Sequence, residues 1–139
     1  GNGNPYIFLM MDIDNFKAVN DIYGHHEGDE VLRYIADSLR QFFRRDDVVI
    51  RIGGDEFVVF IYPCSSVAAI EQKIQKISER YLRKIEQEYP LSRSSLSFGG
   101  VKYNRTTSFL ELYKRADQVL YKVKHNCKGQ FKIVEMKTE

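Results

Sequence analysis

The sequence predicts one α+β domain, in which helices cover a mixed, mainly antiparallel sheet of five strands. Its 139 residues, 43% of them hydrophobic, are enough for one sizeable core. Apolar runs typical of strands alternate with segments of helical periodicity. One pair of these runs is joined by a short glycine-containing turn, which predicts a hairpin inside the alternation.

Five segments have the pattern of β-strands. The first is a continuous apolar run between Pro5 and Asp12, as expected of a strand that is buried on both faces. The runs on either side of Gly53 and Gly54 predict the hairpin, and the glycines are expected to adopt positive φ in a tight turn. The expected strands are residues 6–11, 47–52, 57–61, 96–101 and 130–134.

Four segments have apolar residues at helical spacing. Gly24 is expected to end the first helix. Ser108 and Glu111 have the spacing of a capping box, which predicts the start of the last helix. The expected helices are residues 14–21, 27–43, 66–88 and 108 to about 124.

Composition excludes several classes of protein. A net charge of +2 does not indicate a general nucleic-acid binder, which would concentrate more basic charge on one face. No apolar run is long enough to cross a bilayer, and no secretory signal is visible, so we expect no membrane insertion by this chain. Cys64 and Cys127 lack CxxC spacing, which favours free thiols in a reducing cytoplasm.

The turn Gly53-Gly54-Asp55-Glu56 is the most informative segment of the chain. Its glycines place no side chains over the turn, and its adjacent carboxylates repel each other unless a cation or a proton lies between them. The same residues also suit an ordinary turn with solvated acids. Taken alone, the turn leaves both interpretations open.

The predicted topology favours the metal-binding interpretation. If the strand after Gly54 folds back beside the first strand, the hairpin turn lies at the carboxyl end of the first strand. Acids from two distant segments then meet at one corner, namely Asp12, Asp14, Asp55 and Glu56. Clustered carboxylates are costly without a cation, so the sequence predicts a magnesium site there.

The residues around this corner form an ordered set of motifs, and together they resemble the GGDEF family of diguanylate cyclases. The resemblance extends from about Tyr6 to Val134. It rests on Asp12-Ile13-Asp14-Asn15-Phe16-Lys17, Asn20-Asp21, Gly24-His25, Gly28-Asp29-Glu30-Val31-Leu32, Arg51-Ile52-Gly53-Gly54-Asp55-Glu56-Phe57, Ser97-Phe98-Gly99, Ala116-Asp117, Leu120-Tyr121 and Lys124.

The resemblance implies a ferredoxin-like fold, related to nucleotidyl cyclase and polymerase palm domains, with the order βααββαβαβ. It also implies condensation of two GTP molecules into cyclic di-GMP with release of two pyrophosphates, where two subunits of a homodimer meet. Two Mg²⁺ or Mn²⁺ ions are expected in each half of the active site. The implied metal ligands are Asp12, the Ile13 carbonyl, Asp55 and Glu56, and the implied catalytic residues are Asp55, as proton acceptor, and Glu56.

The resemblance also implies the residues that bind substrate. Asn20 and Asp29 match the guanine-reading positions, because a carboxylate can accept from N1–H and the 2-amino group as a pair. Gly53 and Gly54 border the nucleotide, and His25 matches a further contact, although it could equally be a solvated loop residue. The expected phosphate-binding groups are Asn15, Phe16, Lys17 and Lys114. A phosphate-binding Arg of the family is replaced here by Gln118.

Arg44-Arg45-Asp46-Asp47 precedes the hairpin at the spacing of the family's inhibitory site. The resemblance implies that cyclic di-GMP binds there to Arg44 and Asp47. Arg can donate two parallel hydrogen bonds to guanine or phosphate, and Asp can accept hydrogen bonds from the guanine edge. A charged loop between a helix and a strand is the alternative.

The expected organisation is a linker at residues 1–5, the catalytic domain at residues 6–135 and a tail at residues 136–139. The family normally has a further helix ahead of the first strand, so we expect a fragment of a larger bacterial signalling protein. We expect that protein to carry an upstream sensor or receiver domain and possible membrane anchorage outside this chain. Two other functions stay open: a non-catalytic module that binds GTP or cyclic di-GMP, and a cyclase or polymerase relative that acts on another nucleotide.

Overall fold

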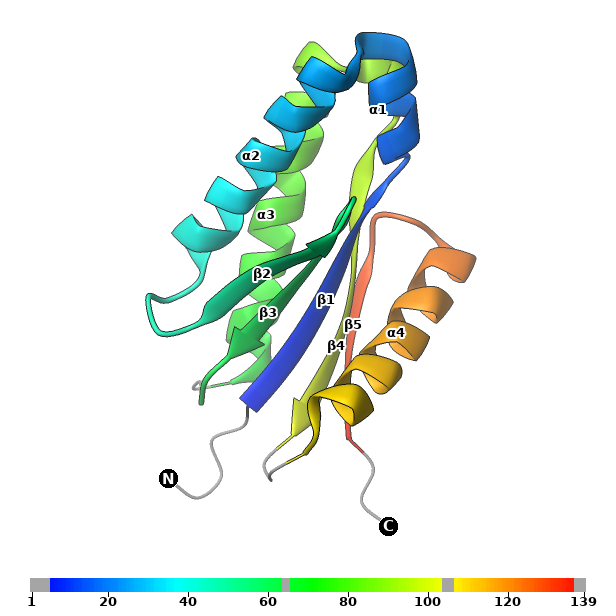
Figure 1. Cartoon of the computed structure of the whole chain (residues 1–139). Coiled ribbons are helices and arrows are strands. Elements are labelled where there is room, and N and C mark those ends of the chain that lie inside the picture. The colour runs from blue at the N-terminus through cyan, green and yellow to red at the C-terminus, as the bar shows by residue number, and fades with distance from the viewer. Residues whose placement is uncertain (1–5, 64–65, 104–106, 137–139) are drawn as a thin grey trace.

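The computed structural model of the chain describes residues 6–63, 66–103 and 107–136. Strands and helices alternate around one hairpin, as the sequence predicts (Figure 1). In chain order the elements are β1 (Tyr6–Asp14), α1 (Phe16–Tyr23), α2 (His25–Phe42), β2 (Val48–Gly53), β3 (Glu56–Ile61), α3 (Val67–Glu88), the 3₁₀ turn η1 (Pro90–Ser92), β4 (Ser95–Tyr103), α4 (Phe109–Asn126) and β5 (Phe131–Glu135).

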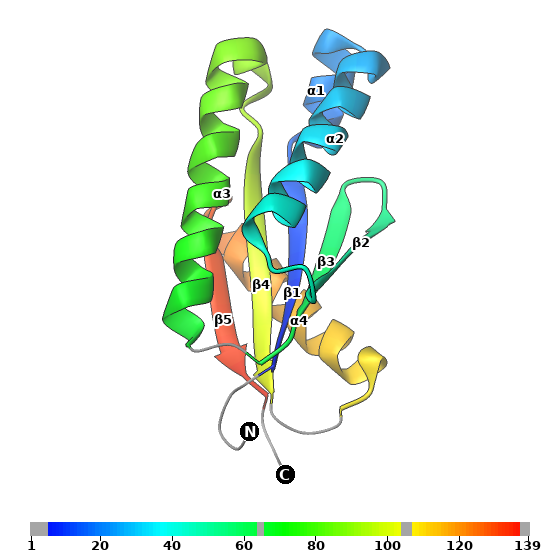
Figure 2. The ribbon, with the colours of Figure 1, turned by 90° about the vertical axis from the view of Figure 1, so that its left-hand side faces the viewer.

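The strands form one five-stranded sheet in the order β2-β3-β1-β4-β5. β1 pairs antiparallel with both β3 and β4, β2 pairs antiparallel with β3, and β5 pairs parallel with β4. This arrangement confirms the mixed, mainly antiparallel sheet. Helices α2 and α3 lie on one face of the sheet and α4 lies on the other (Figure 2).

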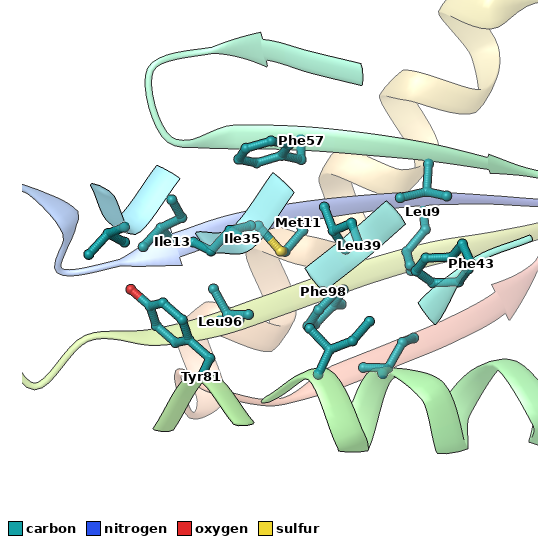
Figure 3. Close-up of a cluster of buried hydrophobic side chains, with 14 of the residues drawn as sticks. Leu9, Met11, Ile13, Ile35, Leu39, Phe43, Phe57, Tyr81, Leu96 and Phe98 are labelled. Carbon is teal, nitrogen blue, oxygen red and sulfur yellow. The ribbon is translucent and has the colours of Figure 1, made fainter. Parts of the chain in front are cut away.

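The central strand β1 is buried on both faces, which confirms the prediction from its continuous apolar run. Ile7, Leu9, Met11 and Ile13 alternate toward the face of α2 and α3, where they join the larger core cluster (Figure 3). The alternate side chains Phe8 and Met10 pack with residues of α4 in a second cluster. Because successive side chains of a strand point to opposite faces, one strand supplies both cores.

The structure corrects several boundaries. β1 continues to Asp14 instead of ending at Met11, because the three residues after Met11 stay paired with β4, with Asp12, Ile13 and Asp14 opposite Ser97, Leu96 and Ser95. The strand ends before Asn15, whose φ of 58° is left-handed, and α1 begins at Phe16.

The remaining differences are small. Helix α2 begins at His25, immediately after Gly24, and β4 extends from Ser95 to Tyr103. The capping prediction is confirmed, because the Ser108 hydroxyl accepts a hydrogen bond of 3.2 Å from the Glu111 amide. Cys127 is a free, exposed thiol, whereas Cys64 lies outside the described residues.

We predict that Gly99→Ala loosens the packing of α4 on the sheet. A Cβ at Gly99 would lie 2.5 Å from the Leu120 amide nitrogen and 2.8 Å from the Ala116 carbonyl oxygen, so the helix backbone must move. We expect a loss of ~3 kcal/mol in urea unfolding. The control is Gly100→Ala, whose new Cβ would meet only movable side-chain atoms of Ile133 and Leu9 at 3.1 Å and the Phe8 carbonyl at 3.5 Å. An equal loss in both variants would contradict this account.

Candidate active site

The sheet register brings the hairpin acids to the end of β1. Asp12 lies directly opposite Glu56 in the β1–β3 pairing, and the Ile13 amide donates a 3.1 Å hydrogen bond to the Asp55 carbonyl. Residues that are far apart in the sequence therefore share one corner, as the predicted topology requires.

The turn at Gly53 and Gly54 is held by an arginine. The Arg51 guanidinium donates two hydrogen bonds to the Gly54 carbonyl, at 3.0 and 2.8 Å. The prediction of positive φ is wrong for both glycines, since the positive-φ glycines of the described chain are Gly24 and Gly129. Apart from the adjoining residues, no heavy atom of the described chain lies within 4 Å of a Cβ built at either turn glycine. These glycines therefore leave an open surface beside the acids.

Helix α4 supplies a partner to each of the two facing carboxylates. The Tyr113 hydroxyl donates a 2.9 Å hydrogen bond to Glu56 Oε1. The Lys124 ammonium donates a 2.9 Å hydrogen bond to Asp12 Oδ2, and it lies 3.7 Å from Asp14 Oδ1. The sequence analysis missed both partnerships. The capping box and the motif residues of α4 place the helix, but no local sequence pattern pairs Tyr113 or Lys124 with β1 and β3.

The electrostatics of this corner favour a bound cation. Burial raises the pKa of Asp12; Lys124 lowers it, and the nearby charges of Asp55 and Asp14 raise it further. Burial also raises the pKa of Glu56, against the hydrogen bond from Tyr113, and the charges of Asp12, Asp117 and Asp55 add to the rise. The hydrogen bond to Glu56, together with burial, raises the pKa of Tyr113 to about 12. Carboxylates whose charge is disfavoured in this way are stabilised by a cation.

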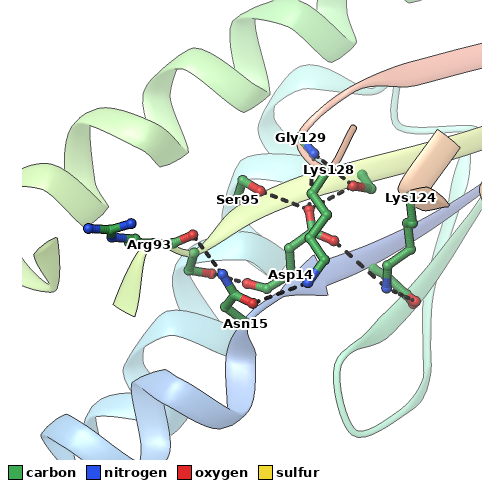
Figure 4. A network of polar contacts seen from close by, with 10 residues as sticks. Asp14, Asn15, Arg93, Ser95, Lys124, Lys128 and Gly129 are labelled. Carbon is green, nitrogen blue, oxygen red and sulfur yellow. Dashed lines mark hydrogen bonds and ion pairs between the residues drawn. The ribbon is translucent and has the colours of Figure 1, made fainter. Parts of the chain in front are cut away.

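Asp14 has a different environment from Asp12, two residues before it. Its side chain is fully enclosed, and its Oδ2 accepts hydrogen bonds from Ser95 Oγ, Ser97 Oγ and the Gly129 amide at 2.8, 2.6 and 3.2 Å (Figure 4). Its Oδ1 is buried and has no hydrogen-bond partner among the described residues. Asp14 therefore lies near the corner, but its carboxylate joins β1, β4 and the turn before β5 and does not face the hairpin.

The predicted phosphate-binding turn follows directly. Asn15 lies in the left-handed conformation between β1 and α1, and its amide donates a 3.0 Å hydrogen bond to the Arg93 carbonyl (Figure 4). Lys128 donates to Asn15 Oδ1 at 3.3 Å. Phe16 packs against the core, and Lys17 is exposed and pairs with Asp21 at 2.6 Å. The turn is thus anchored on both sides by distant segments.

The predicted guanine-reading residues lie where α1 meets α2. The Gly24 amide donates a 2.9 Å hydrogen bond to the Asn20 carbonyl, which closes the last turn of α1. The Asn20 amide group occupies the space that a Cβ at Gly28 would fill, so the glycine makes room for it. His25 and Asp29 are exposed on the first turns of α2. Lys114 is also exposed, on α4 next to Tyr113.

Arg44 and Asp47 bind each other in the loop between α2 and β2. Arg44 Nη2 lies 3.2 Å from Asp47 Oδ1, and the guanidinium also donates to the carbonyls of Tyr62 and Pro63 at 2.6 and 3.1 Å. The Asp47 side chain is fully buried and also accepts from the backbone amides of Arg44 and Tyr62. The pair fastens this loop to the end of β3, and its predicted role in binding product stays a prediction.

The donor chemistry at the corner fits a divalent metal ion. Within the described part of the chain, no three His, Cys, Asp or Glu side chains converge closely enough to hold one unaided. Magnesium usually binds through one or two carboxylates together with substrate phosphates, and not through a complete protein cage. Asp12 and Glu56, facing each other across β1 and β3, form such a partial set of hard oxygen donors.

None of the helices in the described ranges combines the length and the apolar character needed to span a bilayer.

Known proteins share both the sequence and the fold. Residues 1–130 match the family model described as "Diguanylate cyclase, GGDEF domain". An uncharacterized Bacillus subtilis protein, YhcK, is 36% identical over 140 residues, which cover 95% of this chain and 37% of that protein. Diguanylate cyclase DosC of Escherichia coli K12 is 30% identical over 137 residues, covering 94% of this chain and 29% of DosC.

The solved active GGEEF domain of a Vibrio cholerae diguanylate cyclase has a TM-score of 0.79 and 28% identity, and the match covers 96% of this chain and 85% of that domain. Diguanylate cyclase SiaD of Pseudomonas aeruginosa, solved with its activator SiaC, has a TM-score of 0.78 and 27% identity. The match covers 94% of this chain and 50% of the SiaD chain. The chain belongs to the GGDEF domain family, whose named members include diguanylate cyclases. It spans only about a third of the curated relatives' length.

We predict that the two neighbouring aspartates differ in their effect on stability. Asp14→Asn places an amide beside Lys124 and removes the charge of an enclosed side chain that accepts three hydrogen bonds. It should lower the free energy of unfolding, measured in urea, by ~3 kcal/mol. The matched control Asp12→Asn removes a carboxylate whose pKa is raised by burial, and we expect a change below ~1 kcal/mol. Equal losses would show that Asp14 has no special role in the fold.

Proposed function

We propose that this domain condenses two GTP molecules into cyclic di-GMP, with one GTP held by each of two copies of the chain. The single observation that carries the proposal is the meeting of Asp12 and Glu56 across β1 and β3, next to Asp55. Family membership supports it, because several named relatives are diguanylate cyclases. The proposal concerns this domain, which spans about a third of the length of its curated relatives.

In this proposal the corner holds Mg²⁺ or Mn²⁺ against the triphosphate, two ions in each half-site. Asp12, the Ile13 carbonyl, Asp55 and Glu56 are the protein ligands. The bound ions would neutralise the phosphates and lower the pKa of the attacking 3′-hydroxyl. Tyr113 orients the Glu56 carboxylate from α4, and Lys124 on the same helix is a counter-ion of Asp12.

The remaining residues bind and orient GTP. Asn20 and Asp29 read the guanine, with Gly28 leaving room for the Asn20 amide. His25 contacts the nucleotide, and the open surface of Gly53 and Gly54 lets it approach the hairpin. The phosphate-binding groups are the backbone of Asn15 and Phe16 and the side chains of Lys17 and Lys114.

The chemistry is two phosphoryl-transfer steps. The 3′-oxygen of one GTP attacks the α-phosphorus of the other, and Asp55 accepts the hydroxyl proton. The bond from the α-phosphorus to the bridging oxygen breaks, and pyrophosphate leaves. The second 3′-hydroxyl repeats the attack in the opposite direction and closes the ring, which is why both halves must face each other.

The wider assembly follows from this chemistry. The reaction needs a homodimer, and we propose that domains elsewhere in the longer protein, of the sensor or receiver kind, bring two copies together. One relative, SiaD, was solved with a protein named as its activator. Because GTP is an intracellular nucleotide, we place the domain in the bacterial cytoplasm.

We predict that the full chain, dimerised through a fused leucine zipper, converts GTP with Mg²⁺ to cyclic di-GMP and leaves ATP unchanged. Asp55→Asn should lower turnover at least ~100-fold, since it removes both a metal ligand and the proton acceptor. Asp37→Asn, an exposed acid on α2, is the matched control and should keep full activity. Product is measured by chromatography.

A folded dimer that makes no cyclic di-GMP would overturn the enzyme proposal. If that dimer still binds GTP or cyclic di-GMP in calorimetry, the domain is a nucleotide receptor instead. Turnover of ATP in place of GTP would indicate another nucleotidyl cyclase.

We also propose that cyclic di-GMP inhibits the enzyme through Arg44 and Asp47. We predict that Arg44→Ala keeps turning over at product concentrations that stop the wild type. The loop should survive the change with a loss of ~1–2 kcal/mol, because Asp47 still accepts from backbone amides. Arg45→Ala, on the exposed side of the loop, is the control and should stay inhibited. Inhibition of Arg44→Ala at wild-type product levels would rule this site out.

A further inference from the structure

The acidic corner already contains a cation that belongs to the protein itself, namely the ammonium group of Lys124. Its ammonium lies 2.9 Å from Asp12 Oδ2 and 3.7 Å from Asp14 Oδ1. It reaches the corner from the last turns of α4, across the face of the sheet (Figure 4). Among the described residues, it is the only side-chain cation within ion-pair distance of either carboxylate.

The surroundings of Lys124 fit a permanent counter-ion. Burial lowers the pKa of Lys124, but the hydrogen bond to Asp12 and the charges of Asp12, Asp14 and Asp55 raise it by more, so the ammonium keeps its proton. The side chains of Lys124 and Asp12 are 30% and 20% exposed, whereas that of Asp14 is fully enclosed. The Lys124–Asp12 contact is therefore the part of this network that solvent and ions can reach.

An ion arriving at Asp12 meets this ammonium first. A divalent cation bound to the Asp12 carboxylate lies close to the ammonium held there, and two like charges at such a distance repel each other. Metal binding must then either move the ammonium or accept its repulsion. Both lower the affinity of the corner for metal alone.

The structure also provides a place for the displaced ammonium. A cavity of about 380 Å³ beside the corner is lined by Asp12, Asp117, Leu120, Tyr121, Lys124 and His125. Asp117 lies seven residues before Lys124, about two turns along the same helix, and lines the same cavity. The lysine side chain is long and flexible, so its ammonium can leave Asp12 for this cavity.

We propose that Lys124 is a positioning residue that occupies Asp12 in the metal-free site and competes with the first divalent ion. The competition keeps the corner largely metal-free until a metal ion arrives with the triphosphate, whose own oxygens supply further ligands. This inference rests on the metal site of the proposed function, but it concerns metal affinity and is tested without turnover.

The first experiment measures Mn²⁺ binding to the full chain without nucleotide, from the electron paramagnetic resonance signal of free Mn²⁺. Lys124→Met removes the charge and keeps the length, and it should bind Mn²⁺ about five- to tenfold more tightly than wild type, given the partial exposure of the pair. Lys124→Arg keeps the charge and should match wild type. Lys122→Met, an exposed lysine on the same helix, is the control for net charge.

Affinity that is equal or weaker in Lys124→Met would overturn the proposal, as would a failure of both forms to bind Mn²⁺. An increase of the same size in Lys122→Met would attribute the effect to net charge and would also overturn it. Loss of cyclase activity is not a readout here, so a failed cyclase assay and a failed competition are distinguishable.

A second measurement uses the wild-type chain and does not depend on how the Met variant folds. The lysine ¹³Cε–¹Hε signals are followed by nuclear magnetic resonance during a titration with Mg²⁺, and the Lys124 signal is assigned as the one missing in Lys124→Arg. The signal should shift as Mg²⁺ saturates the site, while that of Lys122 stays in place. A Lys124 signal that does not respond while the Asp12 signals shift would show that metal binds beside an undisturbed ion pair, contrary to the proposal.

Discussion

Everything in this domain depends on the burial of β1 between two antiparallel neighbours and two helical layers. A strand enclosed on both faces and both edges has little freedom in register, because a shift by one residue would exchange its two apolar faces. The register with β3 sets Asp12 opposite Glu56, and the register with β4 sets Asp14 opposite Ser95. The core thus determines the positions of the acids to within a residue.

Two aspartates of one short motif then acquire different environments from the same strand. Both point to the face of α4, since they are two residues apart. Asp14 lies at the end of β1, where two serine hydroxyls and a backbone amide donate hydrogen bonds to its carboxylate. Asp12 lies one step closer to the open hairpin, where its side-chain hydrogen-bond partner among the described residues is the partly exposed Lys124. A buried carboxylate needs fixed donors, whereas a partly exposed one can exchange a lysine for a metal ion.

Helix α4 contributes more than packing. Its apolar face covers the sheet so closely that Gly99 has no room for a side chain, and this contact fixes the height of the helix over β1. Tyr113 and Lys124 consequently reach Glu56 and Asp12 from opposite ends of one rigid element. The close packing of Gly99 and the electrostatics of the acidic corner are therefore two results of the same helix position.

The sequence by itself determined the order of elements, the burial of β1, the hairpin and the meeting of distant acids at one corner. These follow from local periodicity and turn chemistry, together with the few topologies they allow. It also indicated the family, because Asp12, Asn20, Asp29 and Asp55 occur in the family's order and spacing.

Only the tertiary structure decided which acid is enclosed, where β1 ends and which residues hold the carboxylates. Asp14 belongs to the strand because of its partners on β4, and those contacts leave no local trace in the sequence. The Lys124–Asp12 pair joins residues 112 positions apart. The Arg44–Asp47 pair is held to the segment after β3, because Arg44 also donates to the carbonyls of Tyr62 and Pro63. Long-range polar contacts depend on how complete elements pack, so a periodic pattern alone cannot reveal them.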